Sequence, residues 1–290
     1  MKVVVAIDSF KGSMTSMQAG NACKEGILAA AHAHCGSGAA AAKDRKPAAD
    51  NMKVVVKPLA DGGEGTVEAL VEGMSGTYEY VPVTGPMGNP VKARYGILPD
   101  QTVVMEMAEA SGITLVKEPL NPWKAASTGV GEMILDAVQK GCRKFIIGIG
   151  GSATTEGGIG MLSALGYDFM DENGDILPPV FASLEKVVQI ENNRVPEMLK
   201  DCHFQIACDV TNPLCGVEGC VYVFGAQKGV KEEEKESMDR AMQSYAACME
   251  KFTGKRFSEI PGTGAAGGLG FAFLWGLPNV ELKTGNRHCS

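Results

Sequence analysis

The sequence lacks the features that mark several large classes of protein. It contains no run of about 18 apolar residues, and its apolar start at 1–7 is too short for the core of a signal peptide. Basic residues number 27 against 34 acidic ones, which gives a formal net charge of −7. Because the chain has no basic field for nucleic acid or an anionic membrane, we expect neither as a partner. A cytoplasmic protein is predicted.

Two kinds of short motif are also missing. The nine cysteines include no C-x-x-C pair and are odd in number, so reduced and mostly buried thiols are predicted instead of a disulfide framework or a metal site. The absence of G-x-x-x-x-G-K-[ST] argues against an ordinary P-loop nucleotide site. Residues 262–267 do match G-x-G-x-x-G, but 258–261 make a poor buried strand, so this dinucleotide signal is weak.

Glycine is abundant, with 37 residues, and it gathers in loops after apolar strands. The most informative stretch has an apolar strand at 145–149, a loop and then a helix. The loop contains Gly150, Gly151, Ser152 and Thr154. Glycine lets the backbone approach a ligand closely, and free N–H groups at a helix start favour an anion such as phosphate. The alternative is a tight turn between two packed elements.

The first predicted strand, 2–7, is followed by Asp8, Ser9 and Lys11. In open α/β sheets, ligands lie at this end of the strands. Asp8 is suited to magnesium or to proton transfer, and Lys11 is suited to a phosphate or a carboxylate. The alternative is a surface loop with a capping aspartate.

A second strand at 52–58 leads to Asp61, Glu64 and a helix at 67–72. Asp61 beside flexible backbone suits hydrated Mg²⁺, which takes one or two carboxylates together with substrate phosphates. For Glu64 we favour a role at the positive helix start. The segment 31–51 is low in complexity, and we expect a mobile surface insert there.

The pattern alternates from residue 77 to Glu106, which predicts antiparallel strands and a second domain that begins near residue 78. Further on, an apolar strand that begins at Phe204 ends at Asp209, with Asn212 close behind it. The chain length of 290 residues also indicates about two domains.

Six motifs, taken in order, resemble those of the bacterial type I glycerate kinases. They begin at Asp8 (D-S-F-K-G-S), Lys57 (K-P-L-A-D-G-G-E-G-T), Gly148 (G-I-G-G-S-A-T), Cys208 (C-D-V-T-N-P-L), Phe224 (F-G-A-Q-K-G) and Gly262 (G-T-G-A-A-G-G). The likeness covers nearly all of 1–283 apart from 31–51. Glu156 stands where the family usually has aspartate, and Ala226 where it usually has proline.

The resemblance implies an α/β fold with two domains. Residues 1–77 would form the N-terminal part of a flavodoxin-like parallel-sheet domain, and 78–283 an inserted mixed-sheet α/β domain with glycine-rich loops. The family's chains continue beyond this one, so we expect the C-terminal half of the first domain to be missing and 284–290 to be an unrelated tail. A homodimer is compatible with the sequence.

The resemblance also implies ATP-dependent phosphorylation of D-glycerate, with 2-phosphoglycerate as the preferred product and 3-phosphoglycerate as the other option. ATP and Mg²⁺ are the expected cofactors. Asp61 and Asp209 would divide metal binding and proton acceptance between them, with the division left open, and Lys11 and Asp8 would assist catalysis. Asp8, Ser9 and Asn212 would bind the substrate. The nucleotide would be held by Gly150, Gly151, Ser152, Thr154, Lys228, Gly264 and Gly267.

Two alternatives belong to other functional classes. One is a truncated, non-catalytic paralogue that binds ligand without turnover. The other is a nucleotide-cofactor oxidoreductase that uses 262–267; it requires a strand before that loop and an acid about 20 residues later, where Glu281 lies near the required distance.

Overall fold

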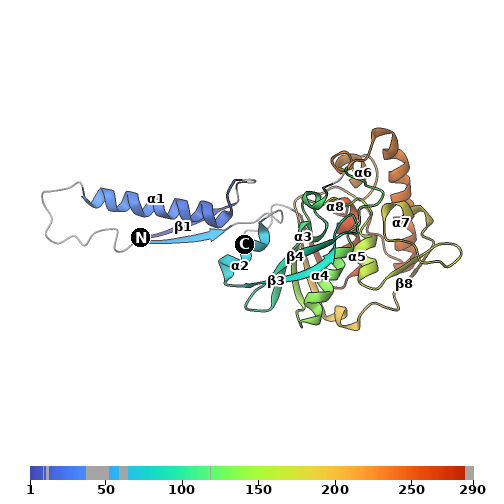
Figure 1. Ribbon diagram of the computed structural model, residues 1–290, viewed down its shortest axis with the longest axis horizontal. Helices are drawn as coiled ribbons and strands as arrows, with labels where there is room; N and C mark the ends of the chain where they lie inside the picture. The colour runs from blue at the N-terminus through green and yellow to red at the C-terminus, as the bar shows by residue number, and fades with distance from the viewer. Residues whose placement is uncertain (9, 11–12, 37–51, 59–64, 118, 285–290) are drawn as a thin grey trace.

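The computed structural model describes residues 1–8, 10, 13–36, 52–58, 65–117 and 119–284. Figure 1 shows an elongated molecule in which a small part, built from the start of the chain, projects from a larger α/β part. The larger part contains the main hydrophobic core, which includes the stacked rings of Phe145 and Phe204 at 4.8 Å between centroids.

The small part consists of β1 (Lys2–Ile7), α1 (Ser16–Gly36) and β2 (Lys53–Pro58). The two strands pair in parallel, as the strand–helix–strand pattern predicted. Gly20 allows α1 to lie close to β2, because a Cβ there would come within 2.3 Å of Val56 Cγ1. The helix continues to Gly36, into the segment that we expected to be an insert, since alanine is the strongest helix former. Residues 37–51 lie outside the described residues.

The larger part is organised around a six-stranded mixed sheet with the order β10-β9-β6-β5-β4-β3. Neighbours from β3 to β5 are antiparallel, as the alternating pattern predicted, and neighbours from β5 to β10 are parallel. The strands are β3 (Thr77–Thr84), β4 (Pro90–Ile97), β5 (Thr102–Glu106), β6 (Lys144–Gly148), β9 (His203–Cys208) and β10 (Val280–Thr284). A separate pair is β7 (Asp168–Met170) and β8 (Gln189–Glu191). A mixed α/β fold with parallel and mixed sheets is confirmed.

Helices and short 3₁₀ turns surround this sheet (Figure 1). The α-helices are α2 (Thr66–Met74), α3 (Ala108–Ser111), α4 (Thr128–Gln139), α5 (Ile159–Ala164), α6 (Cys220–Phe224), α7 (Lys235–Thr253) and α8 (Ala265–Gly276). The 3₁₀ turns are η2 (Ile113–Leu115), η3 (Phe181–Lys186), η4 (Glu197–Asp201), η5 (Ala226–Lys228) and η6 (Glu232–Glu234). None of the described helices has the length and apolar character needed to cross a membrane. The cysteines of the described ranges that can be assessed are free thiols, mostly buried or half-buried.

Helix α2 packs on the six-stranded sheet. Val67 and Val71 form a small buried cluster with Leu98 and Val104, from the end of β4 and from β5. Gly96 makes this packing close, since a Cβ there would lie 2.1 Å from Val71 Cγ2. The predicted domain boundary near residue 78 thus falls between α2 and the strands against which α2 packs.

Candidate active site

The carboxyl ends of β5, β6 and β9 lie at one edge of the sheet. The strand register aligns Glu106 with Gly148, and Gly148 with Ala207. Gly150 and Asp209 each lie two residues beyond this row, so they leave adjacent strands at the same level, where strands are about 4.8 Å apart. The predicted glycine loop and the exposed carboxylate of Asp209 thus share this edge.

A cavity of about 490 Å³ lies between the start of α1 and this edge. The loops singled out by sequence contribute Phe10, Ser13, Gly150 and Gly151 to its lining. Four charged residues that we had not predicted as site residues also line it, namely Glu68, Arg94, Glu106 and Glu109. Glu106 ends an apolar strand as Asp209 does, and that signal was available in the sequence. Arg94 lies within a strand and belongs to no motif.

Glu106 is the most deeply buried of these charged residues, with only 6% of its surface exposed. Burial raises the pKa of its carboxyl group to about 7, although a backbone hydrogen bond opposes the shift. In that bond the Val67 N–H donates to Glu106 Oε1 over 2.8 Å. The carboxylate therefore holds the first turn of α2, whose N-terminal residue Gly65 provides no side-chain cap.

Arg94 and Glu109 form an ion pair at the cavity wall. Arg94 Nε donates to Glu109 Oε1 over 2.8 Å, and the two side chains are 35% and 24% exposed. The guanidinium also lies over the Tyr78 ring, 5.7 Å from its centroid. The cavity is thus lined by both signs of charge.

The two glycine-rich loops, 150–158 and 262–268, pack against each other. Gly157 N donates to Gly267 O over 2.9 Å, and a Cβ at Gly267 would lie 2.1 Å from Thr154 O. Gly264 lies equally close to Pro213 O, at 2.2 Å for such a Cβ. Thr154, Gly264 and Gly267 are buried in this contact, whereas Gly150 and Gly151 face the cavity. Close backbone packing therefore accounts for the glycines of the second loop.

The carboxyl group of Glu156 lies at the start of α5. Glu156 Oε1 accepts hydrogen bonds from Ser127 N at 2.9 Å, from Ser127 Oγ and from Gly160 N at 3.3 Å. Glu156 is fully buried, and burial raises the pKa of its carboxyl group. The backbone at this helix start is thus hydrogen-bonded to a carboxyl group of the protein, and a phosphate at the loop stays a prediction.

Lys228, which we predicted to bind the nucleotide, is buried in the structure. Only 2% of it is exposed, and its Nζ donates to Thr154 O over 2.6 Å. Burial lowers the pKa of the ammonium group to about 8, and the nearby Cys220 and Glu156 partly offset this. In the structure the ammonium group thus supports the interior of the 150–158 loop.

Asn212 also has a role in loop packing. Its side-chain Nδ2 donates to Glu218 O over 2.8 Å, and its backbone carbonyl accepts from Gly264 N over 3.0 Å. Asp8 is exposed at the end of β1 and has an interaction partner. Ser9, Lys11 and Asp61 lie outside the described residues. Among the residues that the structure describes, no three His, Cys, Asp or Glu side chains converge as a metal site.

The oxidoreductase alternative requires a strand directly before 262–267. The described chain from Gly254 to Pro261 contains turns and irregular backbone but no strand. The loop itself runs through left-handed conformations at Ala266, Gly267 and Gly268 instead of opening a regular helix. This geometry does not match a dinucleotide-binding turn.

Comparison with known proteins identifies the family. The glycerate kinase family matches residues 3–288. The chain is 40% identical over 287 residues to glycerate kinase of Haemophilus influenzae, covering 98% of this chain and 71% of the relative. It is also 40% identical to glycerate 2-kinase of Escherichia coli, covering 98% of this chain and 70% of the relative.

A solved structure agrees with these relatives. The crystal structure of a protein described as glycerate kinase 2 in Salmonella typhimurium LT2 superposes with a TM-score of 0.88 at 38% identity. The alignment covers 98% of this chain and 72% of that one. The chain therefore belongs to the glycerate kinase family.

Proposed function

We propose that the protein transfers a phosphoryl group from ATP to D-glycerate, with 2-phosphoglycerate as the preferred product. Family membership across 3–288 is the observation that carries this proposal. The edge of the sheet supports it, because Asp209 and the loop at Gly150 leave adjacent strands at the same level. Phosphoryl transfer depends mainly on positioning and charge neutralisation, and an edge with an acid and a glycine loop is suited to both.

The phosphates of ATP would lie at Gly150 and Gly151. Gly151 has a φ of +73°, which glycine adopts without strain, and its backbone faces the cavity. The shape of this loop would be fixed by buried residues that need not contact the phosphates, namely Thr154, Gly264 and Gly267. Lys228 would contribute through its hydrogen bond to the Thr154 carbonyl.

Mg²⁺ is compatible with the carboxylate of Asp209 at this edge of the sheet. Asp209 is exposed at the end of β9, and Mg²⁺ needs only one or two carboxylates when phosphates and water complete its shell. The ion would neutralise phosphate charge. Asp61 is the second candidate from the sequence, and the division of metal binding and proton acceptance between Asp61 and Asp209 stays open. Ser9, Asp8 and Lys11 stay predictions for substrate and charge.

The test is a coupled assay with ATP and D-glycerate, with the product position assigned by phosphorus NMR. Asp209→Asn should lower kcat by about 100-fold or more if the carboxylate takes the proton or holds the metal. Asp201→Asn is the matched control, because Asp201 is an exposed acid just before β9, at its opposite end, and should leave kcat unchanged. A kcat for Asp209→Asn within threefold of the parent would remove Asp209 from the proposal.

The same assay separates the alternatives. A thermal shift with ATP or D-glycerate but no turnover would favour a non-catalytic binder. A cytoplasmic location and a homodimer also stay predictions, and light scattering after size exclusion tests the second.

A further inference from the structure

Arg94 supplies the cavity's positive charge. Among the described residues that line it, Arg94 is the only basic one, whereas Glu68, Glu106 and Glu109 are acidic. The side chains of this wall offer a single positive charge to an anion. The wall can accept one carboxylate at the guanidinium, because a single anion needs only one cation.

The guanidinium has donors to spare. Glu109 Oε1 accepts from Nε, and within the described part of the chain Nη1 and Nη2 donate to no other group. An arginine presents five N–H groups in a planar fork that matches a carboxylate with two parallel hydrogen bonds. At 35% exposure the side chain is accessible, while its pair with Glu109 and its contact with the Tyr78 ring limit its movement.

We propose that Arg94 binds the carboxylate of the hydroxy-acid substrate, with Glu109 as the internal carboxylate that holds the guanidinium and competes with the substrate for it. This inference rests on the proposed function and assigns the acid end of D-glycerate to β4. The phosphate-binding end of the same cavity would then be at Gly150 and Gly151.

The pair Arg94 and Glu109 allows a test that distinguishes binding from structure. Arg94→Gln removes the receptor, and KM for D-glycerate should rise by about 10-fold to 150-fold, the range that corresponds to 1.5–3 kcal/mol for hydrogen bonds to a charged group. KM for ATP should stay within twofold. Glu109→Gln removes the competitor but keeps the guanidinium, so KM for D-glycerate should fall or stay constant.

A matched control lies on the same strand. Lys92→Gln removes one positive charge from the same face of β4, because Lys92 is two residues before Arg94, and Lys92 does not line the cavity. It should leave both KM values unchanged.

D-Glyceraldehyde, which lacks the carboxylate, provides a second readout. The parent should prefer D-glycerate over D-glyceraldehyde in kcat/KM, and Arg94→Gln should lose most of this preference. Equal rises in KM for Arg94→Gln and Glu109→Gln would show that only the ion pair matters and would overturn the inference.

Failure of this inference is distinguishable from failure of the proposed function. If the parent phosphorylates D-glycerate and Arg94→Gln has the parent's KM, the inference alone is wrong. If the parent shows no turnover, calorimetric titration with D-glycerate decides: binding by the parent that is lost in Arg94→Gln supports the inference. Absence of binding to the parent, or equal binding to both, overturns it.

Discussion

Gly267 combines a left-handed backbone with close packing against another loop. Its φ is +66°, and a Cβ would lie 2.1 Å from Thr154 O and 2.5 Å from Thr155 Cα. Gly254 at the end of α7 has a similar φ of +71° but open space around it. The two glycines therefore share the conformational requirement and differ in the close approach of another backbone.

We predict that Gly267→Ala is clearly more destabilising than Gly254→Ala. The left-handed conformation alone costs about 1–2 kcal/mol in either variant. Gly267→Ala must in addition separate two buried loops, and overpacking typically adds about 1–3 kcal/mol. Urea unfolding of both variants measures the difference. Equal losses would mean that the loops can move apart freely, contrary to the packing described.

The sequence predicted those site residues that come directly after apolar strands. It did not predict those that reach the site only through tertiary contacts. Asp209 and Gly150 follow apolar strands, and the parallel register brings them to one edge. Arg94 carried no local signal, because its position beside Glu109 exists only after β4 and α3 come together. Glycine also serves both ligand approach and close backbone packing with the same sequence pattern, and the packing at Gly267 is visible only in the structure.

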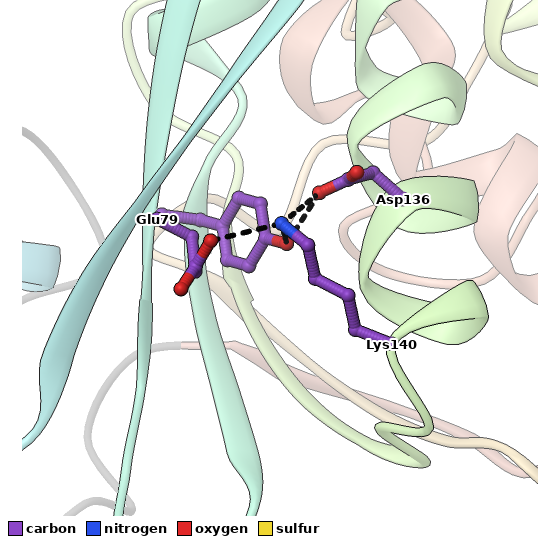
Figure 2. Close-up of polar contacts among 4 residues, drawn as sticks. Glu79, Asp136 and Lys140 are labelled. Carbon is purple, nitrogen blue, oxygen red and sulfur yellow. Dashed lines mark hydrogen bonds and ion pairs between the residues drawn. The ribbon is translucent and has the colours of Figure 1, made fainter.

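At the scale of elements, one polar cluster joins α4 to β3 and β4. Figure 2 shows Lys140 pointing between Glu79 and Asp136. Its Nζ also lies 5.3 Å from the centroid of the Tyr95 ring. Lys140 Nζ donates to Glu79 Oε2 over 2.9 Å, to Asp136 Oδ2 over 2.8 Å and to Tyr95 OH over 3.0 Å. Burial lowers the pKa of Lys140, but these hydrogen bonds outweigh it and the net pKa is raised. Burial and the bond to Asp136 raise the pKa of Tyr95.

We predict that this cluster stabilises the fold at neutral pH and loses its effect in alkali. A raised folded-state pKa means that the folded protein holds the proton more tightly, so the stabilisation is complete below the unfolded lysine pKa of about 10.4 and is lost as pH rises through the folded-state value. At pH 8, Lys140→Met should lower the free energy of unfolding by up to about 1 kcal/mol, since the side chain is 37% exposed. The difference from the parent should shrink above about pH 10.5.

Lys200→Met is the matched control for this prediction. Lys200 forms a single ion pair with Glu197, and both side chains are largely exposed, at 73% and 85%. Such a pair contributes little, so this variant should unfold like the parent at every pH. A pH-independent loss in Lys140→Met would indicate that only the packing of its aliphatic chain matters.

Periodicity predicted most elements, because a strand or helix with one buried face has a pattern that a short window reveals. The alternation across 77–106 predicted the antiparallel strands β3, β4 and β5. The packing of α2 was not predictable, because the sequence does not show whether its apolar face contacts the β1–β2 sheet or the six-stranded sheet. Tertiary contacts such as that between Gly96 and Val71 show where it lies.

At the scale of the whole molecule, burial is very unequal between the two parts. Among the described residues before α2, Ala19 and Val54 are the only buried apolar side chains, and Val4 on β1 is 55% exposed. The strands β6 and β9, by contrast, lie in the middle of the sheet and carry fully buried residues such as Ile147 and Ile206. Few buried contacts permit local opening at low free energy.

We therefore predict that hydrogen exchange is faster in the small part than in the larger part, with the cavity lying between them. Amides of β1 and β2 should exchange through small local openings, while those of β6 and β9 should approach the global free energy of unfolding, which is typically about 5–15 kcal/mol. D-Glycerate with an ATP analogue should slow exchange at 13–18 and 106–115, which line the cavity from its two sides, because a ligand that contacts both sides opposes their separation. The pair β7 and β8 contributes no residue to the cavity and serves as the internal control. Protection confined to one side would show that the ligand does not bridge the two parts, and exchange in β1 as slow as in β6 would contradict the unequal burial.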